Sequence, residues 1–530
     1  MLVTSVIVYL LVTIAIGLYA AQRVHGAKDF LVAGRSLPLY MNMATVFATW
    51  FGAETVLSVS ATFAKDGLHG VPADPFGASV CLVLVALFYA RRFYKMELLT
   101  IGDFYHKRYG KSVEVLTSLA ITISYLGWTS AQLTALGLVI TVLSGGDLTL
   151  SQGIVIGAAV VLFYTVWGGM WSVAFTDLFQ TVVILVGLTL VAFLIGDMAG
   201  GAGKVIAQAH ADGKLQFWPR GGWADWLTFI AAFLTMALGS IPQQDVFQRV
   251  TSAKNEKTAV RGTLFGAAAY FVFAFVPMFI AYAALMVDPA LVKLFESDDA
   301  REIQRILPEL VLARMPLWAQ VMFFGALLSA ILSTASGALL APSSLFTENV
   351  LRPFMPRLSD RRFLVLIRSV LVLFTAGALM FALNSRSTMY EMVQNAYKVT
   401  LAGAFIPLTF GLFWRRATTQ GALLSAILGL GAWLSAEALG ADALVPPQFV
   451  GLLAGLAGML VGSLGPQVYT ERLPHDAYTG AGHPGHGARA GHGAHGAHGT
   501  HGTHGAHGAP GPHAGHGSGG ADSGQDAPRR

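Results

Sequence analysis

The stretch MNMATVFATWFGAETVLSVSATF, residues 41–63, holds one charged residue, Glu54, in a run that apart from Asn42 is otherwise apolar, small or hydroxylic. A run of this length can cross a bilayer as a helix, which takes about 20 residues. A carboxylate inside a bilayer costs about 3 kcal/mol on insertion scales, so such a residue usually faces a cavity or a partner. Gly52 lies at mid-depth in the same run, where the helix can break. If the chain spans a membrane, this stretch is expected to hold a polar site.

The composition is that of a membrane protein. Of 530 residues, 54% are hydrophobic and only 12% are charged, and the mean hydropathy is +0.60. Soluble domains carry about twice that charged fraction. We therefore predict an all-α polytopic membrane protein with about thirteen transmembrane helices. The predicted segments are residues 2–21, 37–63, 75–91, 114–143, 149–167, 171–197, 224–243, 262–287, 315–347, 362–384, 388–414, 419–438 and 447–467. The first is expected to be a retained helix and not a removed signal peptide, because equal segments follow it.

The charged residues predict the orientation in the membrane. Lys and Arg gather in alternate loops, within residues 23–35, 91–111, 249–261, 352–362 and 415–416. Basic loops mark the cytoplasmic face. The other loops are poorer in basic residues and hold Asp66, Asp74, Asp147, Asp288, Asp298, Asp299 and Glu302. The N-terminus is thus predicted outside and the C-terminus in the cytoplasm. The net charge of +5 reflects this topology, and nucleic acid is not expected as a partner.

The composition changes after Pro466 to Gly, Ala and His, with HGAHGAHGTHGTHGAHG at residues 492–508. Such a tract cannot form a core, so we predict a transmembrane domain over residues 1–467 and a disordered cytoplasmic tail over residues 468–530. Neutral imidazoles at this density can chelate divalent metals loosely. The candidate ligands are His492, His495, His498, His501, His504 and His507. The alternative is a solvated low-complexity tail, because the spacing of a tetrahedral site is missing.

A second candidate break lies in MALGSIPQQDVFQR, residues 236–249. Pro242 removes a backbone donor and frees carbonyl groups that can bind an ion or a polar solute. The bland interpretation is a helix that ends at the cytoplasmic surface, because Asp245 and Arg249 follow closely. The sequence leaves these two interpretations open.

The ninth segment holds hydroxyl groups on one helix face. Ala330, Ser333 and Thr334 are spaced i, i+3 and i+4. Hard cations take several oxygen ligands, and two hydroxyls beside the freed carbonyls of a broken helix supply them. Alternatively, the hydroxyls bond back to their own helix or join two helices.

Several motifs together resemble the sodium:solute symporter family, which includes bacterial proline and sugar symporters. These motifs are FLVAGRSLP (30–38), TIGDFYHKRYG (100–110), GGMWSVAFTDLFQ (168–180), IPQQDVFQRV (241–250), LSAILSTASGALLAPSSLFTEN (328–349) and GLFWRRATTQGAL (411–423). The resemblance covers residues 1–467. It implies the inverted five-plus-five helix repeat of the leucine transporter (the LeuT fold), with one extra N-terminal helix and two C-terminal helices.

The resemblance also implies site residues. The family's coupling sodium would be held at Ala48, Phe51, Ala330, Ser333 and Thr334. Substrate contacts would fall on Trp50, Glu54, Thr55, Trp128, Gln132, Met236, Ser240, Gln243 and Gln244. Asp177 matches an acidic residue that relatives need for transport, although it could equally be a charge at a helix N-terminus.

This chain departs from the family at Trp50, where proline-transporting relatives carry aspartate and sugar-transporting ones asparagine. Glu54 lies four residues later on the same helix face. Our hypothesis is that Glu54 contacts the substrate or a second cation while Trp50 forms an apolar wall. A purely structural Glu54 is the alternative. Lys398 is a conceivable partner for Glu54, or it snorkels to the membrane surface.

The expected function is sodium-coupled uptake of a small organic solute by alternating access across a bacterial cytoplasmic membrane, with sodium as the co-transported ion and no enzyme activity. Proton-coupled uptake through Glu54 is one rival, and a membrane sensor that binds a solute or a metal is another. The sequence leaves the solute open among amino acids, monocarboxylates, sugars and vitamins.

Overall fold

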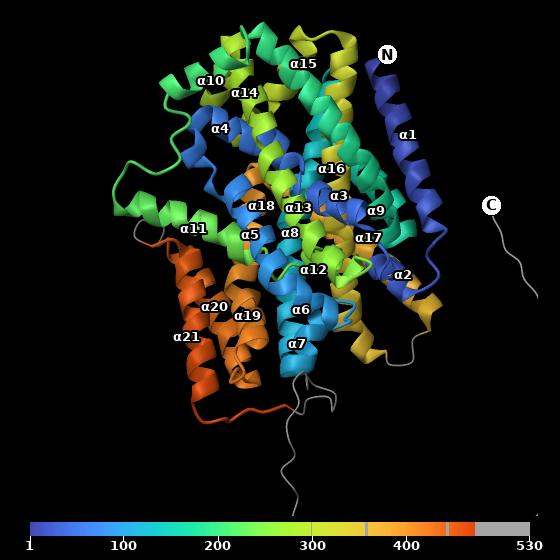
Figure 1. Cartoon of the computed structure of the whole chain (residues 1–530), viewed down its shortest axis with the longest axis vertical. Helices are drawn as coiled ribbons and strands as arrows, with labels where there is room; N and C mark the ends of the chain where they lie inside the picture. Colours follow the sequence, from blue (N-terminus) through green and yellow to red (C-terminus); the bar gives the residue numbers. More distant parts are fainter. Residues whose placement is uncertain (298, 356–358, 441–444, 472–530) are drawn as a thin grey trace, which may run out of the picture. The chain divides into compact units, whose positions relative to one another are not determined.

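Helices make up most of the part of the chain that the structure describes. The computed structural model describes residues 1–297, 299–355, 359–440 and 445–471 (Figure 1). These residues belong to one compact unit, Met1–Tyr478. Their one isolated backbone bridge joins Leu37 and Ala253. The predicted tail, with the candidate metal ligands from His492 to His507, lies outside the described residues apart from its first four.

Ten helical segments in the described part are long and apolar enough to cross a membrane. They are Leu2–Ala21 (α1), Pro72–Lys95 (η4 to α6), Lys111–Leu143 (α8), Thr165–Met198 (within α9, Leu150–Met198), Glu256–Val287 (α13 and α14), Leu317–Phe354 (α16 to η9), Asp360–Asn384 (α17), Met389–Phe413 (α18 to α19), Thr419–Leu439 (α20) and Pro447–Leu464 (α21). Two bent helix pairs raise the number to twelve. These pairs are Leu39–Trp50 with Glu54–Asp66 (α3 with η2 and α4) and Trp223–Gly239 with Gln244–Ser252 (α11 with α12).

The prediction of about thirteen spans differs from this number at one place. The segments predicted at 149–167 and 171–197 are both present, as two helices within α9 that are separated by non-helical backbone at Gly169 (φ 50°, ψ −143°). The part before the kink, Leu150–Phe163, is apolar but shorter than the ten spans. Glycine permits the positive φ without strain, so the two helices are joined at this residue without a longer loop.

Several spans consist of shorter consecutive helical elements, and further short helices connect the spans. Within the spans, the bounds are Glu54–Val59 (η2), Ser60–Asp66 (α4), Pro72–Gly77 (η4), Ala78–Leu84 (α5), Val85–Tyr89 (η5), Ala90–Lys95 (α6), Glu256–Phe273 (α13), Phe275–Val287 (α14), Leu317–Leu345 (α16), Phe346–Leu351 (η8), Arg352–Phe354 (η9), Met389–Thr400 (α18), Leu401–Phe405 (η10) and Ile406–Phe413 (α19). Between the spans lie Ala27–Val32 (α2), Ala33–Arg35 (η1), Leu68–Gly70 (η3), Ile101–Tyr109 (α7), Ala202–Ala211 (α10), Pro289–Glu296 (η6), Ala300–Arg305 (η7) and Ile306–Arg314 (α15).

The start of the first broken helix pairs with the end of the second. The Leu37 amide donates to the Ser252 carbonyl at 3.0 Å, and the Lys254 amide donates to the Leu37 carbonyl at 2.9 Å. Leu37 precedes α3, whereas Ser252 ends α12. One broken helix therefore begins where the other finishes, which is the relationship that an inverted repeat requires.

The first break lies where the sequence predicts it. α3 ends at Trp50, and the chain bends by 54° before it continues at Glu54. A Cβ on Gly52 would collide with the Glu54 carboxylate and would lie 2.9 Å from Thr334 Oγ1. Glycine at this position therefore lets a carboxylate and a hydroxyl from another helix approach the broken backbone.

The second break resolves the question that the sequence left open at Pro242. α11 ends at Gly239, the chain bends by 45°, and α12 continues from Gln244. Asp245 and Arg249 are 1% and 2% exposed, so this segment does not end at a surface. The Tyr125 hydroxyl donates to the Asp245 carboxylate, and Arg249 Nε donates to Thr49 Oγ1 at 2.9 Å.

The interior is built around α16. In the most apolar 18-residue stretch of Leu317–Phe354, 94% of the residues are buried. The helix packs against α8 and α9 (Figure 1). By contrast, only 17% and 28% of the residues are buried in the corresponding stretches of α1 and α20, so most of their apolar side chains face outward. Such an outward apolar surface is what a membrane protein presents to lipid.

Candidate functional site

The predicted sodium ligands come together between α3 and α16. Ser333 Oγ donates to the Ala48 carbonyl at 2.9 Å and to the Ala330 carbonyl at 3.0 Å. Thr334 Oγ1 donates to the Ala48 and Thr49 carbonyls at 3.2 and 3.1 Å. The hydroxyls thus do more than bond back to their own helix, because they reach the last turn of the broken helix.

Phe51, the fifth predicted ligand, directly follows that last turn. Its backbone (φ −87°, ψ 75°) has left the helical conformation. Phe51, Ser333 and Thr334 are buried. The donor set consists of neutral hydroxyl and carbonyl oxygens, which suits a hard monovalent cation as a transported ion.

Glu54 follows the break directly and is 4% exposed. Gln132 Nε2 donates to Glu54 Oε2 at 2.6 Å, and Trp128 Nε1 donates to Glu54 Oε1 at 3.3 Å. The same Gln132 accepts a hydrogen bond from the Ala53 amide at 3.2 Å through its Oε1. Three predicted substrate residues, Glu54, Trp128 and Gln132, are therefore one hydrogen-bonded group that links the break to α8.

Aromatic rings pack against one another beside this group. The ring of Trp50 is parallel to that of Tyr397 at a centroid distance of 6.4 Å, and Tyr270 meets Trp50 edge-on at 6.4 Å. Trp128 lies 6.1 Å from Tyr397. The four rings come from α3, α8, α13 and α18, and each is at most 5% exposed. We call Trp50, Trp128, Tyr270 and Tyr397 the aromatic enclosure.

A second buried carboxylate joins the enclosure at Asp74. The predicted place of this residue in an exterior loop is wrong, because Asp74 is 2% exposed within η4. The Tyr270 hydroxyl donates to Asp74 Oδ1, and Thr55 Oγ1 donates to Asp74 Oδ2 at 3.2 Å. The predicted substrate residue Thr55 therefore connects the broken helix to Asp74.

The substrate residues predicted along the second broken helix do not all have the same neighbours. Ser240 Oγ donates to Met236 Sδ at 3.4 Å at the end of α11. Gln243 Nε2 donates to Ser124 Oγ at 3.1 Å and to Thr400 Oγ1 at 3.3 Å, and so faces α8 and α18. Gln244 instead accepts from the Ile101 amide at 2.8 Å, at the first turn of α7.

Asp177 and Arg249 are two buried charged residues near the predicted sodium ligands. Asp177 is fully buried in α9, and neither carboxylate oxygen has a hydrogen-bond partner among the described residues. The Arg249 guanidinium acts on it electrostatically and binds Thr49, whose carbonyl accepts from Thr334. Asp177 lies about two turns past the kink at Gly169, so it is not at a helix N-terminus.

Lys398 pairs with Glu437 and not with Glu54, the partner considered from the sequence. Its Nζ lies 3.5 Å from Glu437 Oε1 on α20, and its side chain is 17% exposed. The Glu54 carboxylate is instead bound by the neutral donors Gln132 and Trp128.

Sequence reasoning missed Asp74, Tyr270, Tyr397 and Arg249 as members of the site. Asp74 and Arg249 stand near the predicted ends of apolar segments, where charged residues usually contact water. The two tyrosines carry no signal of their own, since aromatic residues are common in membrane helices.

These observations define the class of the protein as a membrane transporter. Two broken helices in an inverted relationship bring freed carbonyls, hydroxyls and buried carboxylates together inside a helical bundle, which is how secondary transporters build their ion and substrate sites.

The comparisons with known proteins identify the family. The profile of the sodium:solute symporter family matches residues 30–429, and the chain belongs to this family. The high affinity choline transporter 1 of Homo sapiens is 27% identical over 438 residues, which cover 80% of this chain and 75% of the relative. The sodium/iodide cotransporter of Homo sapiens is 27% identical over 467 residues, covering 83% and 69%.

Solved structures show the same fold. A Na⁺-coupled sialic acid symporter superimposes with a TM-score of 0.74 at 20% identity, covering 88% of this chain and 98% of that one. Mhp1, a nucleobase-cation-symport-1 family transporter, gives a TM-score of 0.54 at 15% identity, covering 81% and 93%. The chain is thus a multi-pass membrane protein with a LeuT-like fold, and its function is sodium-coupled symport of a small solute, not enzymatic catalysis.

Proposed function

We propose that this symporter takes up an organic cation with a quaternary or similarly substituted ammonium head. The observation that carries the proposal is the aromatic enclosure with its two buried carboxylates. Ammonium ions bind the faces of Trp and Tyr rings, an attraction worth about 2 kcal/mol or more per ring when desolvated. Glu54 touches the enclosure through Trp128, and Asp74 touches it through Tyr270.

The charges at the site favour a cation over an anion. Glu54 and Asp74 are both buried beside the enclosure. Buried charges require a partner, and a cationic substrate supplies one for a carboxylate. The relatives named as choline transporters support the same substrate class, since choline carries a trimethylammonium head. The relative named as a sodium/iodide cotransporter makes an anion the rival.

In this proposal sodium is bound by Ala48, Phe51, Ala330, Ser333 and Thr334. The ion would replace the hydrogen bonds that now join the two hydroxyls to the α3 carbonyls. Because those bonds connect α3 to α16, an ion there stabilises one arrangement of the two helices over the other. The substrate reaches the buried rings only when the surrounding helices separate, so sodium and substrate act on the same equilibrium.

We further propose that the basic loops face the cytoplasm, with the N-terminus outside and the C-terminus inside, in a bacterial cytoplasmic membrane. The positive-inside distribution of Lys and Arg supports this orientation.

The test is uptake of labelled choline, glucose and iodide into proteoliposomes under an inward sodium gradient, an equal potassium gradient and a pH gradient. Choline should accumulate only with sodium. Glu54→Gln keeps the size of the side chain and removes its charge, so it should reduce choline uptake. Accumulation of iodide or glucose without choline would refute the cation proposal. Choline accumulation driven by a pH gradient in potassium would refute the sodium site.

A further inference from the structure

Asn349 joins the helical segment of the proposed sodium ligands to α7 and α8. It is fully buried in η8, within the segment Leu317–Phe354 that also carries the sodium ligands of α16. Its Nδ2 donates to Asp103 Oδ1 at 2.9 Å and to Glu114 Oε1 at 2.7 Å. Its Oδ1 accepts from Thr100 Oγ1 at 2.6 Å. The amide nitrogen and the amide oxygen are therefore both engaged by neighbouring helices.

These contacts specify an asparagine. A Cβ on Gly102 would collide with the Asn349 amide group, so glycine at this position lets α7 reach it. A neutral amide can donate to Asp103 and Glu114 at the same time, whereas an aspartate would face these two carboxylates with acceptors only. An apolar side chain would leave the buried Glu114 without this donor.

α7 also holds the second broken helix. The Ile101 amide donates to Gln244 Oε1 at 2.8 Å, at the start of α12. Ile101 is the first residue of α7, and Thr100 and Asp103 form the capping box of this helix. The same two residues are the α7 partners of Asn349. The first turn of α7 is therefore bonded both to η8 and to α12.

The direct hydrogen bond between α12 and α16 is longer. Gln248 Nε2 on α12 donates to Ser344 Oγ on α16 at 3.4 Å. The bonds of Asn349 are 2.6–2.9 Å long, and two of them end on carboxylates, which strengthens a hydrogen bond. The route through α7 is thus the firmer link between the segment of the sodium ligands and the second broken helix.

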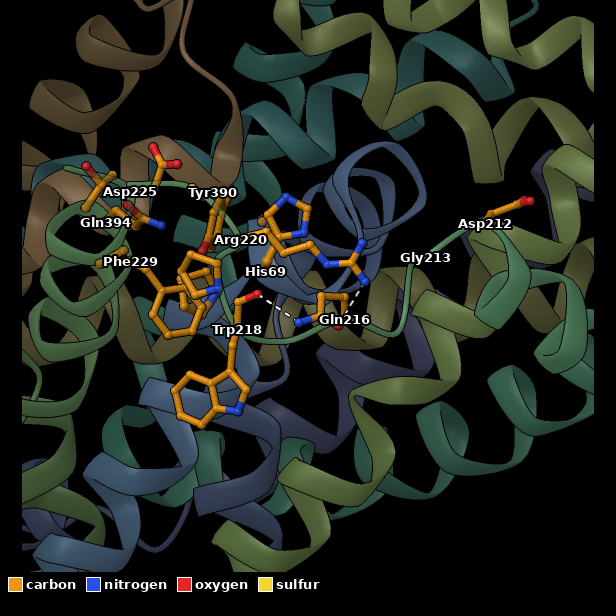
Figure 2. Close-up of a pocket in the computed structure, with 16 residues that line it drawn as sticks. His69, Asp212, Gly213, Gln216, Trp218, Arg220, Asp225, Phe229, Tyr390 and Gln394 are labelled. Atoms are coloured by element: carbon orange, nitrogen blue, oxygen red, sulfur yellow. Dashed lines mark hydrogen bonds between the residues drawn. The ribbon is translucent and has the colours of Figure 1, made fainter. Parts of the chain in front are cut away.

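The second broken helix borders a cavity at its start and is buried at its end. The cavity has a volume of about 750 Å³, and Asp225 and Phe229 from the first turns of α11 line it (Figure 2). Neither Asn349 nor any of its hydrogen-bond partners lines this cavity. Every residue of α12, from Gln244 to Ser252, is buried. A reagent therefore reaches the end of α12 only when α12 separates from its neighbours.

We propose that Asn349 is a positioning residue, which transmits the binding of sodium at α16 to the second broken helix through α7. Sodium alters the fit between α3 and α16 and so shifts the segment that ends in η8. Asn349 passes this shift to the first turn of α7, and Gln244 carries it to α12. The inference requires sodium coupling but does not depend on which solute is transported.

Labelling of a cysteine at the end of α12 tests this role. Ser252→Cys is the reporter, because Ser252 is buried and is the last residue of α12. The one cysteine of the chain, Cys81, is fully buried, and protein without the reporter measures its background. The full-length protein in proteoliposomes is labelled with N-ethylmaleimide in sodium and in potassium buffer. The ratio of the two labelling rates is the sodium response.

The sodium response is compared with Asn349 intact, with Asn349→Ala and with Thr347→Val. Thr347 is the matched control, because it is buried in η8 and its hydroxyl donates to the Ser343 carbonyl of its own helical segment at 2.6 Å. With Asn349 intact, sodium should change the labelling rate by about fivefold or more. Asn349→Ala should reduce this change to less than about twofold, and Thr347→Val should retain it.

Two further measurements separate positioning from a structural role. Sodium should still raise the Tm of the Asn349→Ala protein, because its sodium ligands are unchanged. A purely structural Asn349 would lower the Tm in both buffers and leave the sodium response as it is. Gly102→Ala should lower the Tm less in the Asn349→Ala protein than in the wild type, since the clash is gone. Equal falls in Tm would show that the two residues do not meet.

The proposal is overturned by a sodium response that Asn349→Ala leaves unchanged, or by the absence of a sodium response with Asn349 intact. If Asn349→Ala does not fold, Thr100→Val decides, because it removes the hydroxyl that donates to Asn349. An unchanged sodium response in Thr100→Val would then overturn the proposal, and a reduced one would support it. Choline uptake is measured separately, and its absence would refute the proposed solute without altering this test.

Discussion

Ser333 on α16 donates its hydroxyl to the carbonyl of Ala48, near the end of the first broken helix, at 2.9 Å. This contact joins helices that are 285 residues apart in sequence. It identifies the place where an ion would alter the fit between α3 and α16.

The first prediction concerns this contact. Ser333→Ala should raise the sodium concentration for half-maximal uptake by about tenfold to a hundredfold, since one oxygen ligand to a charged group contributes about 1.5–3 kcal/mol. Sodium-dependent uptake into proteoliposomes measures it. Ser343→Ala is the control, because Ser343 is buried in the same helix and donates to the Leu339 carbonyl of that helix. An unchanged sodium dependence in Ser333→Ala would contradict the proposed ligand set.

The second prediction concerns the aromatic enclosure. Tyr397→Leu removes a ring that lies parallel to Trp50 and should raise the KM for choline by about tenfold or more, given about 2 kcal/mol for a desolvated cation–π contact. Tyr397→Phe keeps the ring and should stay close to the wild-type KM. Equal effects of the two substitutions would show that the hydroxyl or the side-chain volume matters instead of the ring.

The first broken helix could be predicted from the sequence because its signals are local. Gly52 and Glu54 stand deep within an apolar run, where a helix break and a charge are rare unless they form a polar site. The hydroxyls of Ser333 and Thr334 also share a face by simple helical spacing. Their meeting with the Ala48 carbonyl is long-range, and only the family resemblance indicated it.

The second broken helix and Asp74 could not be predicted with the same certainty. Asp245 and Arg249 look like surface residues in the sequence, and they are buried because Tyr125 and Thr49 from other helices bond to them. Asp74 is buried in the same way by Tyr270, which is 196 residues away. A charge near the end of an apolar segment has the same local pattern whether or not such a distant partner exists.

The third prediction concerns the close approach of α11 and α18 at the second break. A Cβ on Gly239 would lie 2.5 Å from the Tyr397 carbonyl oxygen and 3.2 Å from Leu401 Cβ. Gly239→Ala should therefore destabilise the protein by about 1–3 kcal/mol, as overpacking does. Gly431→Ala is the matched control, because no atom lies within 4 Å of its Cβ and alanine favours the helix by up to about 1 kcal/mol. Thermal unfolding in detergent should give a lower Tm for the first variant only.

The fourth prediction concerns pH and the contact between α7 and α8. His106 Nδ1 lies 2.6 Å from Glu114 Oε2, and the Glu114 carboxylate raises the pKa of His106 above its ordinary value of 6.5. Asp103 and Glu471 act in the same direction. Glu114 also accepts from Asn349 at 2.7 Å, so the histidine is tied to η8 as well.

A raised pKa means that the folded protein binds the proton more tightly than the unfolded chain. The stabilisation by protonated His106 is fully present below pH 6.5 and is lost as the pH rises through the raised value. The Tm difference between the wild type and His106→Gln should therefore be largest in mild acid and should shrink as the pH increases from 6.5. The measurement is thermal unfolding of both proteins across this range. A difference that stays constant or grows with pH would show that His106 is neutral in the fold and that its contact with Glu114 contributes through packing alone.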